Sequence, residues 1–307
     1  MEQTRTRRYE PKQKKRRPLF KYLLLFVILI IAWGGYQYYA GQQLAKESKV
    51  KEEPFEGDKA SGKVTNYLVL GVDTRGEEKS RTDTMMLVSW NRDTDKLKLV
   101  SFMRDIYADI PGHTSYKLNT AYYLGGAQLA KDTISSMFDV PIHHYALLDF
   151  KNFESIIDIL APNGVAIDVE KDMSQNIGVT LTQGEHNLNG QELLGYARFR
   201  MDGEGDFGRV RRQQQVIEAV KDQALSVTSI PKLPKLVGAV QGYVATDIGS
   251  MEQLTTVLRV ALSGVDVEKL TVPEQGMFSY NSYAHAGSVI ELDLEKTVQS
   301  LHLFLEK

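Results

Sequence analysis

The run Val64-Thr-Asn-Tyr-Leu-Val-Leu-Gly-Val72 leads directly into Asp73-Thr-Arg75. A mostly apolar stretch that ends near a glycine and a polar loop is typical of a buried β-strand. Two more strands are expected close by, at Thr84–Trp90 and Lys96–Phe102, separated by a short polar turn. Asp73 then follows one strand and Arg104 follows another. Ligands of open α/β sheets usually bind at such carboxyl ends of strands.

The rest of the chain alternates helical and extended patterns. Helices are expected where apolar residues recur at helical spacing, at Asn119–Phe138, Phe150–Leu160, after the cap Asn189, and at Arg209–Leu225, Pro234–Val244 and Met251–Leu262. Further strands are expected at Pro141–Leu148, Val165–Val169 and Lys269–Val272. Alternation of this kind indicates the α/β class.

The N-terminus has the pattern of a membrane anchor. Residues 1–21 carry nine lysines and arginines against two glutamates, and residues 22–45 contain no charge. About 20 apolar residues span a hydrocarbon core, and a basic flank stays in the cytoplasm. We therefore expect a cytoplasmic tail (1–21), a single transmembrane helix (22–40), a charged linker without packed structure (41–63) and an extracellular domain (64–307).

Three other interpretations compete with the anchor. A cleaved signal peptide has an apolar region of only about 7–15 residues and a small-residue cleavage site, which Tyr38-Tyr39-Ala40 matches poorly. A buried core helix would not explain the charge asymmetry of its flanks. The basic run could instead contact nucleic acid, but its position directly before the span favours contact with anionic lipid.

Composition narrows the classes of function. The 307 residues include no cysteine, which excludes disulfides, thiol nucleophiles and thiolate metal sites. The net charge is −2, and without residues 1–21 it is −9, from 28 basic and 37 acidic side chains. A domain this acidic is not expected to bind nucleic acid non-specifically. Any anion site in it must be a local concentration of arginine.

Two aspartates flank the polar loop that follows the first strand. If the loop folds back, Asp73 and Asp83 can face one cation, with Arg75 and Arg81 beside them. Two carboxylates are a minimal set for Mg²⁺ that also holds phosphates. A hairpin whose surface charges pair with one another would explain the same residues and contribute little stability. Spacing alone leaves both interpretations open.

A second arginine-rich stretch lies far along the chain. Arg198 and Arg200 would face the same way in an extended segment. Arg209, Arg212 and Gln213 share one face of the expected helix, near its N-terminus, where free N–H groups favour anions. Guanidinium groups match phosphate oxygens bidentately, so these residues predict a phosphorylated ligand. The alternative is a solvated basic face.

Other motifs have simpler explanations. Asp206 precedes the expected helix, and capping is the commoner role for such an aspartate. His143 and His144 have no further histidine at a metal-ligand spacing, so we assign them to the core or the surface. Tyr122 and Tyr123 suit the core, or the wall of an apolar groove. The sequence contains no Gly-x-Ser-x-Gly elbow and no Walker phosphate loop.

Over about Val64–Leu225 the sequence resembles the LytR-CpsA-Psr family, and the tail and single span also stand in family order. The resemblance depends on six blocks, which are Leu-Gly-Val-Asp73-Thr-Arg75, Ser-Arg81-Thr-Asp83-Thr, Arg104-Asp105, Lys117-Leu-Asn119-Thr-Ala-Tyr122, Tyr196-Ala-Arg198-Phe-Arg200 and Gly205-Asp206-Phe-Gly-Arg209-Val-Arg-Arg212-Gln213. Several blocks in the right order are far more specific than any one of them. One departure is Phe102-Met103 before Arg104, where many relatives have Ile-Pro.

The resemblance implies a membrane-anchored α/β/α sandwich with a central mixed sheet. It also implies a phosphotransferase that moves a glycopolymer (wall teichoic acid, capsule or a related polysaccharide) from a polyprenyl pyrophosphate onto peptidoglycan as a phosphodiester. The lipid would lie in an apolar tunnel between sheet and helices. The implied partners are the lipid-linked polymer, peptidoglycan and membrane lipid, with no nucleic acid.

The resemblance further implies residue roles. Asp73 and Asp83 would hold Mg²⁺, with Mn²⁺ as an alternative. Arg104, Asp206 and Arg209 would be catalytic, with Asp206 as the base for the acceptor hydroxyl. The pyrophosphate would be bound by Arg75, Arg81, Arg104, Lys117, Arg198, Arg200, Arg209, Arg212 and Gln213. Such a site stabilises charge on the leaving phosphate and needs no protein nucleophile.

Two other functions are kept in view. A membrane-bound regulator or attenuator of transcription, a label the family has also carried, would use the basic tail on nucleic acid. Twenty-one residues without a recognition fold argue against it. A polyprenyl pyrophosphate hydrolase would share every site residue and differ only in using water as the acceptor.

Overall fold

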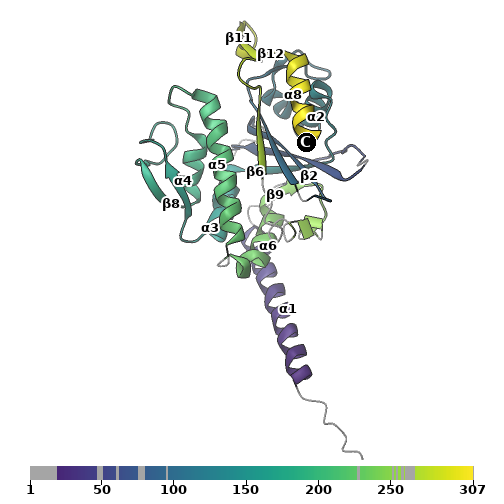
Figure 1. The fold of residues 1–307 in the computed structure, drawn as a ribbon, viewed down its shortest axis with the longest axis vertical. Coiled ribbons are helices and arrows are strands. Elements are labelled where there is room, and N and C mark those ends of the chain that lie inside the picture. Colours follow the sequence, from purple (N-terminus) through teal and green to yellow (C-terminus); the bar gives the residue numbers. More distant parts are fainter. Residues whose placement is uncertain are drawn as a thin grey trace, which may run out of the picture.

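The computed structural model describes residues 19–46, 51–59, 62–74, 80–94, 96–226, 229–250, 252–253, 255–256, 259 and 267–306. The tail up to residue 18, Arg75 and most of the helix expected at Met251–Leu262 lie outside these residues. Figure 1 shows a long helix that leads up to a domain built on a central sheet.

The central sheet has six strands in the order β10-β3-β2-β1-β6-β9. Its three middle strands are consecutive antiparallel neighbours, while β6 joins β1 and β10 joins β3 in parallel. The sheet is therefore mixed, as expected. Its strands are β1 (Val64–Val72), β2 (Thr82–Asn91), β3 (Lys96–Phe102), β6 (His144–Asp149), β9 (Val244–Thr246) and β10 (Val267–Val272).

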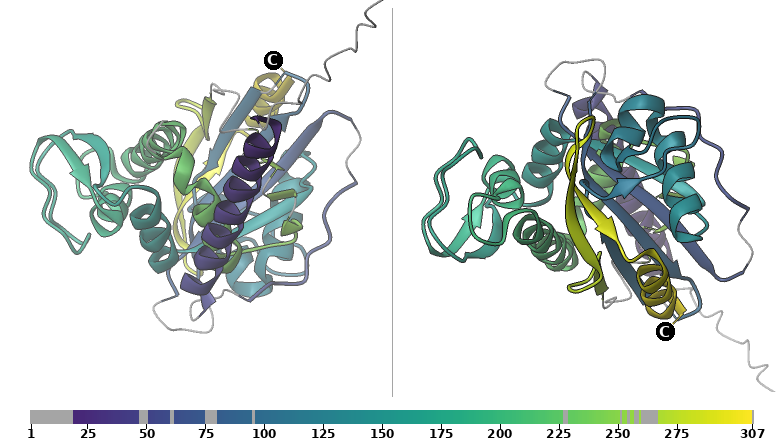
Figure 2. Two further views of the ribbon diagram at one scale, coloured as in Figure 1. Left: turned by 90° about the horizontal axis from the view of Figure 1, so that it is seen from below. Right: turned by 90° about the horizontal axis from the view of Figure 1, so that it is seen from above.

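Helices cover both faces of this sheet, and the α/β/α sandwich is confirmed (Figures 1 and 2). One face carries α2 (Asn119–Phe138) and α8 (Leu294–Glu306), and the other carries α3 (Phe150–Leu160), α4 (Gly190–Arg198) and α5 (Gly205–Leu225). Three small two-stranded sheets complete the domain. They pair β4 (Tyr107–Ala108) with β5 (Tyr116–Lys117), β7 (Val165–Val169) with β8 (Gly184–Leu188), and β11 (Phe278–Tyr283) with β12 (Gly287–Leu292).

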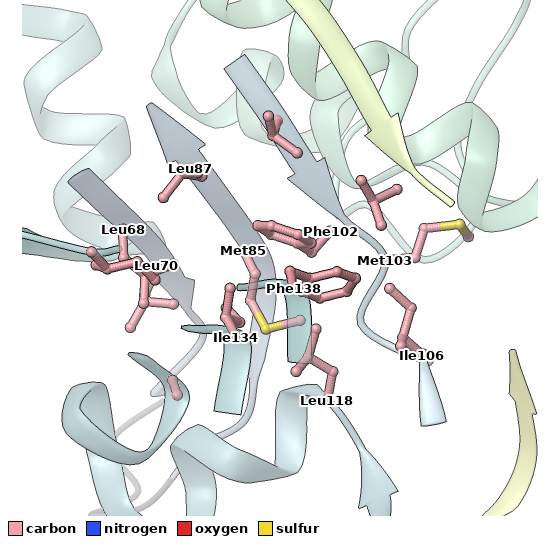
Figure 3. Packing of buried hydrophobic residues seen from close by; sticks show 14 of the residues in the cluster. Leu68, Leu70, Met85, Leu87, Phe102, Met103, Ile106, Leu118, Ile134 and Phe138 are labelled. Carbon is pink, nitrogen blue, oxygen red and sulfur yellow. The ribbon is translucent and has the colours of Figure 1, made fainter. Parts of the chain in front are cut away.

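The main core lies between the sheet and α2. Alternate residues of β1, such as Leu68 and Leu70, point to the same face and are fully buried, as are Ile134 and Phe138 of α2 (Figure 3). Each such side chain contributes about 1.5–3 kcal/mol to stability by leaving water. This core fixes β1, β2 and β3 relative to one another, so the loops at their ends have defined positions.

Helix α1 (Leu19–Leu44) precedes the domain, and within the described residues its stretch Lys21–Leu44 is long and apolar enough to cross a membrane. Its last turns pack on α6 (Leu233–Tyr243), which follows the 3-10 turn η2 (Ile230–Lys232). The contact is made by glycines. A Cβ on Gly41 would lie 2.0 Å from the Lys235 carbonyl oxygen, and one on Gly238 would lie 2.1 Å from that of Tyr38. Small residues let the two backbones touch, the arrangement that tightens helix pairs in membranes.

The expected unpacked linker is wrong for residues 51–59, which are fastened to the domain as a strap. Glu53 accepts hydrogen bonds from the Tyr122 hydroxyl and from the Ala127 N–H, both at 2.7 Å. Its own N–H donates to the Tyr145 hydroxyl at 2.9 Å. At Gly126, where φ is +65°, helix α2 is interrupted, and the Glu53 carboxylate supplies the acceptor that the second half of α2 needs at its start.

Replacing Glu53 by alanine should lower the free energy of unfolding by about 1–3 kcal/mol, because the Ala127 N–H and the Tyr122 hydroxyl both lose their acceptor. Denaturant unfolding measures this loss, and hydrogen exchange at Ala127 should accelerate. The matched control is Glu52→Ala, since Glu52 is the exposed neighbouring glutamate. An equal effect of the two substitutions would contradict a specific role of Glu53.

The two adjacent histidines are structural. His143 is buried, and its Nδ1 accepts the Asn66 N–H at 2.9 Å; burial, together with the charge of His144, lowers its pKa. His144 Nδ1 lies 2.7 Å from the Asp247 carboxylate, whose hydrogen bond raises the pKa of His144 above 6.5. His144 thus joins β6 to the segment after β9, and His143 joins the residue before β6 to β1.

His144 should make stability depend on pH. Because its pKa is higher in the folded state, its contribution is fully present below pH 6.5 and is lost as pH rises through the folded pKa. The difference in unfolding free energy between the native protein and His144→Gln should therefore shrink across that interval. Denaturant unfolding over a pH series measures it, and a gap that grows with pH would contradict the assignment.

Candidate active site

Three strand ends and one helix start supply the charged residues of the site. Asp73 follows β1 directly after an irregularity in the β1–β2 register at Gly71 and Val72, and Asp83 lies at the start of β2. Arg104 follows the end of β3. The Met103 N–H, a donor that a proline at this position would lack, donates to the Val272 carbonyl at 2.9 Å and ties the residue before Arg104 to β10.

Arg104 stands at the centre of three carboxylates. Its Nη1 donates to Asp83 Oδ1 at 2.5 Å, and its Nε lies 3.4 Å from Asp206 Oδ2 and 3.6 Å from Asp105 Oδ2. Burial opposes the charge of this guanidinium, but the carboxylates of Asp206, Asp83 and Asp105 outweigh it and raise the pKa of Arg104. The guanidinium is thus held in one orientation before any ligand arrives.

Helix α5 begins four residues earlier than expected, which changes the role of Asp206. The helix starts at Gly205 and has Glu204 as its cap, with no side-chain capping bond. The capping explanation for Asp206 is therefore wrong. Its carboxylate instead lies 3.2 Å from Arg209 Nη2, one turn further along, and faces Arg104.

Arg209 is the most buried arginine that faces this network, with a side chain only 5% exposed. Its Nη1 lies 4.0 Å from Asp83 Oδ1. Burial lowers the pKa of Arg209, and the positive charges of Arg104 and Arg200 act in the same direction against the carboxylates. A cation in such surroundings gains when an anion approaches, because the anion relieves both the desolvation and the repulsion.

Arg198 reaches the same region from α4. It lies in the last turn of that helix, so the expectation that Arg198 and Arg200 belong to one extended segment is wrong. Its Nη2 lies 3.2 Å from Asp73 Oδ2, and its guanidinium lies over the Phe150 ring at 5.1 Å. Arg200, which is exposed, is close enough for its charge to act on Arg209.

Lys117 and Arg81 complete the rim of basic groups. Lys117 Nζ donates to Asp105 Oδ1 at 2.8 Å, and although burial opposes it, this bond and the charge of Arg104 lower the pKa of Asp105. Asp105 was not among the expected site residues. Its position directly after Arg104 is the sequence feature that could have indicated it. Arg81 is exposed, with its guanidinium 5.9 Å from the centre of the Tyr123 ring.

Two residues of the expected pyrophosphate set face inward. Arg212 is fully buried, donates to the Phe199 carbonyl at 3.0 Å and pairs with Asp202, so its partners are the segment between α4 and α5. Gln213 donates to the Thr84 hydroxyl at 3.0 Å and connects α5 to β2. Gln213 therefore lies beside the charged network. Arg212 does not face this network and instead holds the segment between α4 and α5 in place.

Two cavities meet at this network. One, of about 590 Å³, is lined by Asp73, Ser80, Arg81, Asp83, Arg104, Asp105, Tyr116, Lys117, Asn119, Tyr123 and Ala286. The other, of about 150 Å³, is almost entirely apolar and runs between the sheet and α3 to α5. Arg198, Gln213 and Thr84 belong to its wall, beside side chains such as Phe150, Met86 and Ile217. The ion pair between Arg198, in the wall of the apolar cavity, and Asp73, in the wall of the charged cavity, places the two cavities next to each other.

The donor set fits a metal that phosphates help to hold. Among the described residues, no group of three or more histidine, aspartate or glutamate side chains is placed to hold an ion alone. Asp73 and Asp83 line the same cavity, and arginines contact one oxygen of each. Mg²⁺ is commonly bound through one or two carboxylates together with substrate phosphates, so these two residues suit it only when a phosphate ligand is present.

Comparison with known families assigns the chain. A profile of the LytR_cpsA_psr family matches residues 34–301. The chain belongs to the LytR-CpsA-Psr family. The matched region contains every described residue of the network above.

Individual relatives agree with this membership. The chain is 43% identical over 282 residues to the regulatory protein MsrR of Staphylococcus aureus (strain COL), covering 91% of this chain and 86% of MsrR. It is 32% identical over 251 residues to the polyisoprenyl-teichoic acid–peptidoglycan teichoic acid transferase TagU of Bacillus subtilis (strain 168), covering 78% and 81%. Among solved structures, B. subtilis TagV superposes with a TM-score of 0.66 at 27% identity, over 80% of this chain and 99% of TagV.

Proposed function

We propose that this protein is a membrane-bound enzyme that transfers a glycopolymer from a polyprenyl pyrophosphate onto peptidoglycan as a phosphodiester. One observation carries the proposal: Arg104, Arg209 and Arg198 converge with four aspartates beside an apolar cavity that shares Arg198. A pyrophosphate with a long apolar tail matches this pair of chambers in both charge and polarity. The relative TagU, a teichoic acid transferase, supports the same reaction class.

In the proposed reaction, an acceptor hydroxyl oxygen attacks the phosphorus atom that bears the polymer. The bond from this phosphorus to the bridging oxygen breaks, so a phosphodiester forms and polyprenyl monophosphate leaves. Arg104 and Arg209 stabilise the negative charge that grows on the phosphate oxygens, which is the main protein contribution to phosphoryl transfer. Asp206, beside both arginines, takes the proton of the acceptor hydroxyl and releases it to solvent.

Asp73 and Asp83 would hold Mg²⁺ or Mn²⁺ with the pyrophosphate. When bound, the ion neutralises charge on the phosphate oxygens and orients them. The chain itself prepares these carboxylates, since Arg198 holds Asp73 and Arg104 holds Asp83 before the ligand enters. Arg81, Lys117 and Arg200 then surround the outer phosphate oxygens.

Helix α1 would cross the cell membrane once, with the N-terminus in the cytoplasm and the domain outside. Its composition and length suit a span, and it continues into the contact with α6. A lipid carrier held in the same membrane could then place its first isoprene units in the apolar cavity. Outside the cell no ATP is available, so the pyrophosphate of the donor supplies the energy of transfer.

The proposal is tested with the full-length protein in liposomes that contain a polyprenyl-pyrophosphate oligosaccharide, together with peptidoglycan fragments. We expect a covalent polymer–peptidoglycan product that disappears with a chelator, returns with Mg²⁺ or Mn²⁺, and is lost in Asp83→Asn. Glu252→Gln, which alters an exposed carboxylate far along the chain, is the control. Released polymer without linkage would identify a hydrolase instead. If the donor stays intact and neither linked nor released polymer is found, both the transferase and the hydrolase are contradicted, and the transcriptional regulator is favoured.

A further inference from the structure

Four rings gather at one edge of the charged cavity. They come from three separate segments, and we call them the aromatic rim: Tyr107 of β4, Tyr116 of β5, Tyr283 of β11 and His285 of the following turn. Tyr107 and Tyr283 are stacked with centroids 4.6 Å apart and planes inclined by 19°. The imidazole of His285 lies 5.7 Å from Tyr283 and 5.9 Å from Tyr116.

The rim is continuous with the charged cavity. Tyr116 and Ala286, the residue after His285, both line that cavity. The hairpin that carries Tyr283 and His285 is tied to the network by the Ile290 N–H, which donates to the Asp105 carbonyl at 2.9 Å. A molecule bound on the rim would therefore have one end at the cavity that contains Asp105 and Lys117.

The rings of the rim are partly exposed to solvent, whereas aromatic rings are more often buried in a hydrophobic core. His285 is exposed and the three tyrosines are only half-buried. Their polar edges are already held: His285 Nε2 lies 3.1 Å from the Ser115 carbonyl, and the Tyr283 hydroxyl pairs with Glu291. The orientation of the rings is thus fixed, and although Tyr107 and Tyr283 cover one face of each other, all four rings keep surface open to solvent. Rigid rings lose little entropy when they bind.

The chemistry of the rim selects its occupant. Ring faces bind the C–H faces of sugar rings, and the carbonyl and carboxylate groups beside them can accept hydrogen bonds from sugar hydroxyls. Lys117, the cross-strand partner of Tyr107, is already paired with Asp105, which argues against nucleic acid or another polyanion as the occupant. Two rings of the rim, Tyr283 and His285, belong to the hairpin β11–β12, which Figure 1 shows at the end of the domain opposite α1, so a bilayer that contains α1 would not reach them.

We propose that the aromatic rim binds the glycan strand of the acceptor and places one of its sugar hydroxyls at the charged cavity. The proposal rests on the proposed transferase, whose second substrate needs a place that the donor chambers do not provide. Donor and acceptor would then approach the network from opposite sides. The lipid would come from the apolar cavity beside α3 to α5, and the glycan from the hairpin.

Binding to uncross-linked peptidoglycan glycan strands, freed of their stem peptides, tests this with the full-length protein in detergent. Tyr283→Ala and His285→Ala should each weaken binding about five- to tenfold, as expected for the loss of one aromatic contact. Tyr283→Phe should bind like the native protein, because it keeps the ring. The matched control is Tyr280→Ala, since Tyr280 is on the same strand, is 68% exposed, and lies an odd number of positions from Tyr283, hence on the other face.

Turnover separates this proposal from the proposed function. In the liposome assay the two alanine variants should raise KM for glycan strands by the same factor while retaining the affinity for the donor lipid. Unchanged strand binding in both variants would overturn the rim, as would an equal loss in Tyr280→Ala or binding that requires the stem peptides. If the native protein binds strands through the rim but forms no covalent product, the transferase fails and the rim stands. If the native protein forms the covalent product and the alanine variants form it equally well, the rim proposal fails and the transferase stands.

Discussion

Replacing Arg104 by alanine is expected to lower kcat for polymer transfer by about 10²–10³-fold, the usual cost of removing one preorganised donor that stabilises developing charge. Arg104 connects the carboxylates of Asp83, Asp105 and Asp206. Its loss leaves Arg209 as the cation beside Asp83 and Asp206, and Lys117 as the cation beside Asp105. KM for the donor should rise less than kcat falls, because the interaction strengthens as charge moves to the leaving phosphate. Steady-state kinetics in liposomes measures both quantities.

Two controls separate charge from geometry. Arg104→Lys keeps the positive charge but loses the planar fork, so it should recover only part of the activity. Arg92→Ala, which removes an exposed arginine paired with Glu252, should behave like the native protein. Activity of Arg104→Ala within a few-fold of the native value would exclude Arg104 from the chemistry. Denaturant unfolding of each variant shows whether the fold is retained.

Replacing Arg212 by methionine is expected to destabilise the domain by about 3–5 kcal/mol, the typical cost of breaking a buried ion pair from one side. The Arg212 side chain is fully buried and its partner Asp202 is only 8% exposed, so the aspartate would keep a charge with little access to water and with Lys171 as its remaining cation. The Phe199 carbonyl would also lose its donor. Denaturant unfolding at neutral pH measures the loss.

The neighbouring Arg211 gives a matched comparison. It pairs with Glu170 and Glu204 on the surface, and its own side chain is 40% exposed. Exposed pairs contribute about 0–1 kcal/mol, so Arg211→Ala should change stability far less than Arg212→Met. If the two substitutions cost the same, the burial of Arg212 would not explain its contribution.

Local signals account for the elements whose ends the sequence placed well. β1, β3 and α3 begin and end at the expected residues. For α3 the reason is visible: the Asp149 carboxylate accepts the Lys151 N–H at 2.8 Å at its start, and Pro162 follows its end. Such signals act within a few residues and can be read without the rest of the fold.

Distant contacts account for what was missed. The sequence of the hairpin β11–β12 resembles a polar loop because its support comes from Tyr107 and Asp105, about 180 positions earlier. Helix α8 is a different case: Val298, Leu301 and Phe304 recur at helical spacing and pack on the core, so a local signal was present and was missed.

The density of arginines and aspartates indicated a charged site, but spacing could not say which charge meets which. Helical spacing put Arg212 on the same face as Arg209, and only the packing of α4 against α5 turns Arg212 toward Asp202. Asp105 was passed over because no pattern in the sequence shows that Lys117 returns to it through β5. The same limit hid the strap, where a charged linker is anchored by Glu53.

The close packing of α1 on α6 at Gly41 and Gly238 has a consequence for where the enzyme can work. With α1 in the bilayer as proposed, the domain has no swivel at the membrane surface, because the two helices meet backbone to backbone. The active site is then held at one fixed distance from the membrane surface. The lipid-linked donor diffuses in the plane of the membrane and can reach the site. The peptidoglycan acceptor, in contrast, must lie in the layer of the wall at that distance from the membrane. The oldest, outermost layers of the wall would be out of range, and polymer would be added only to the innermost one.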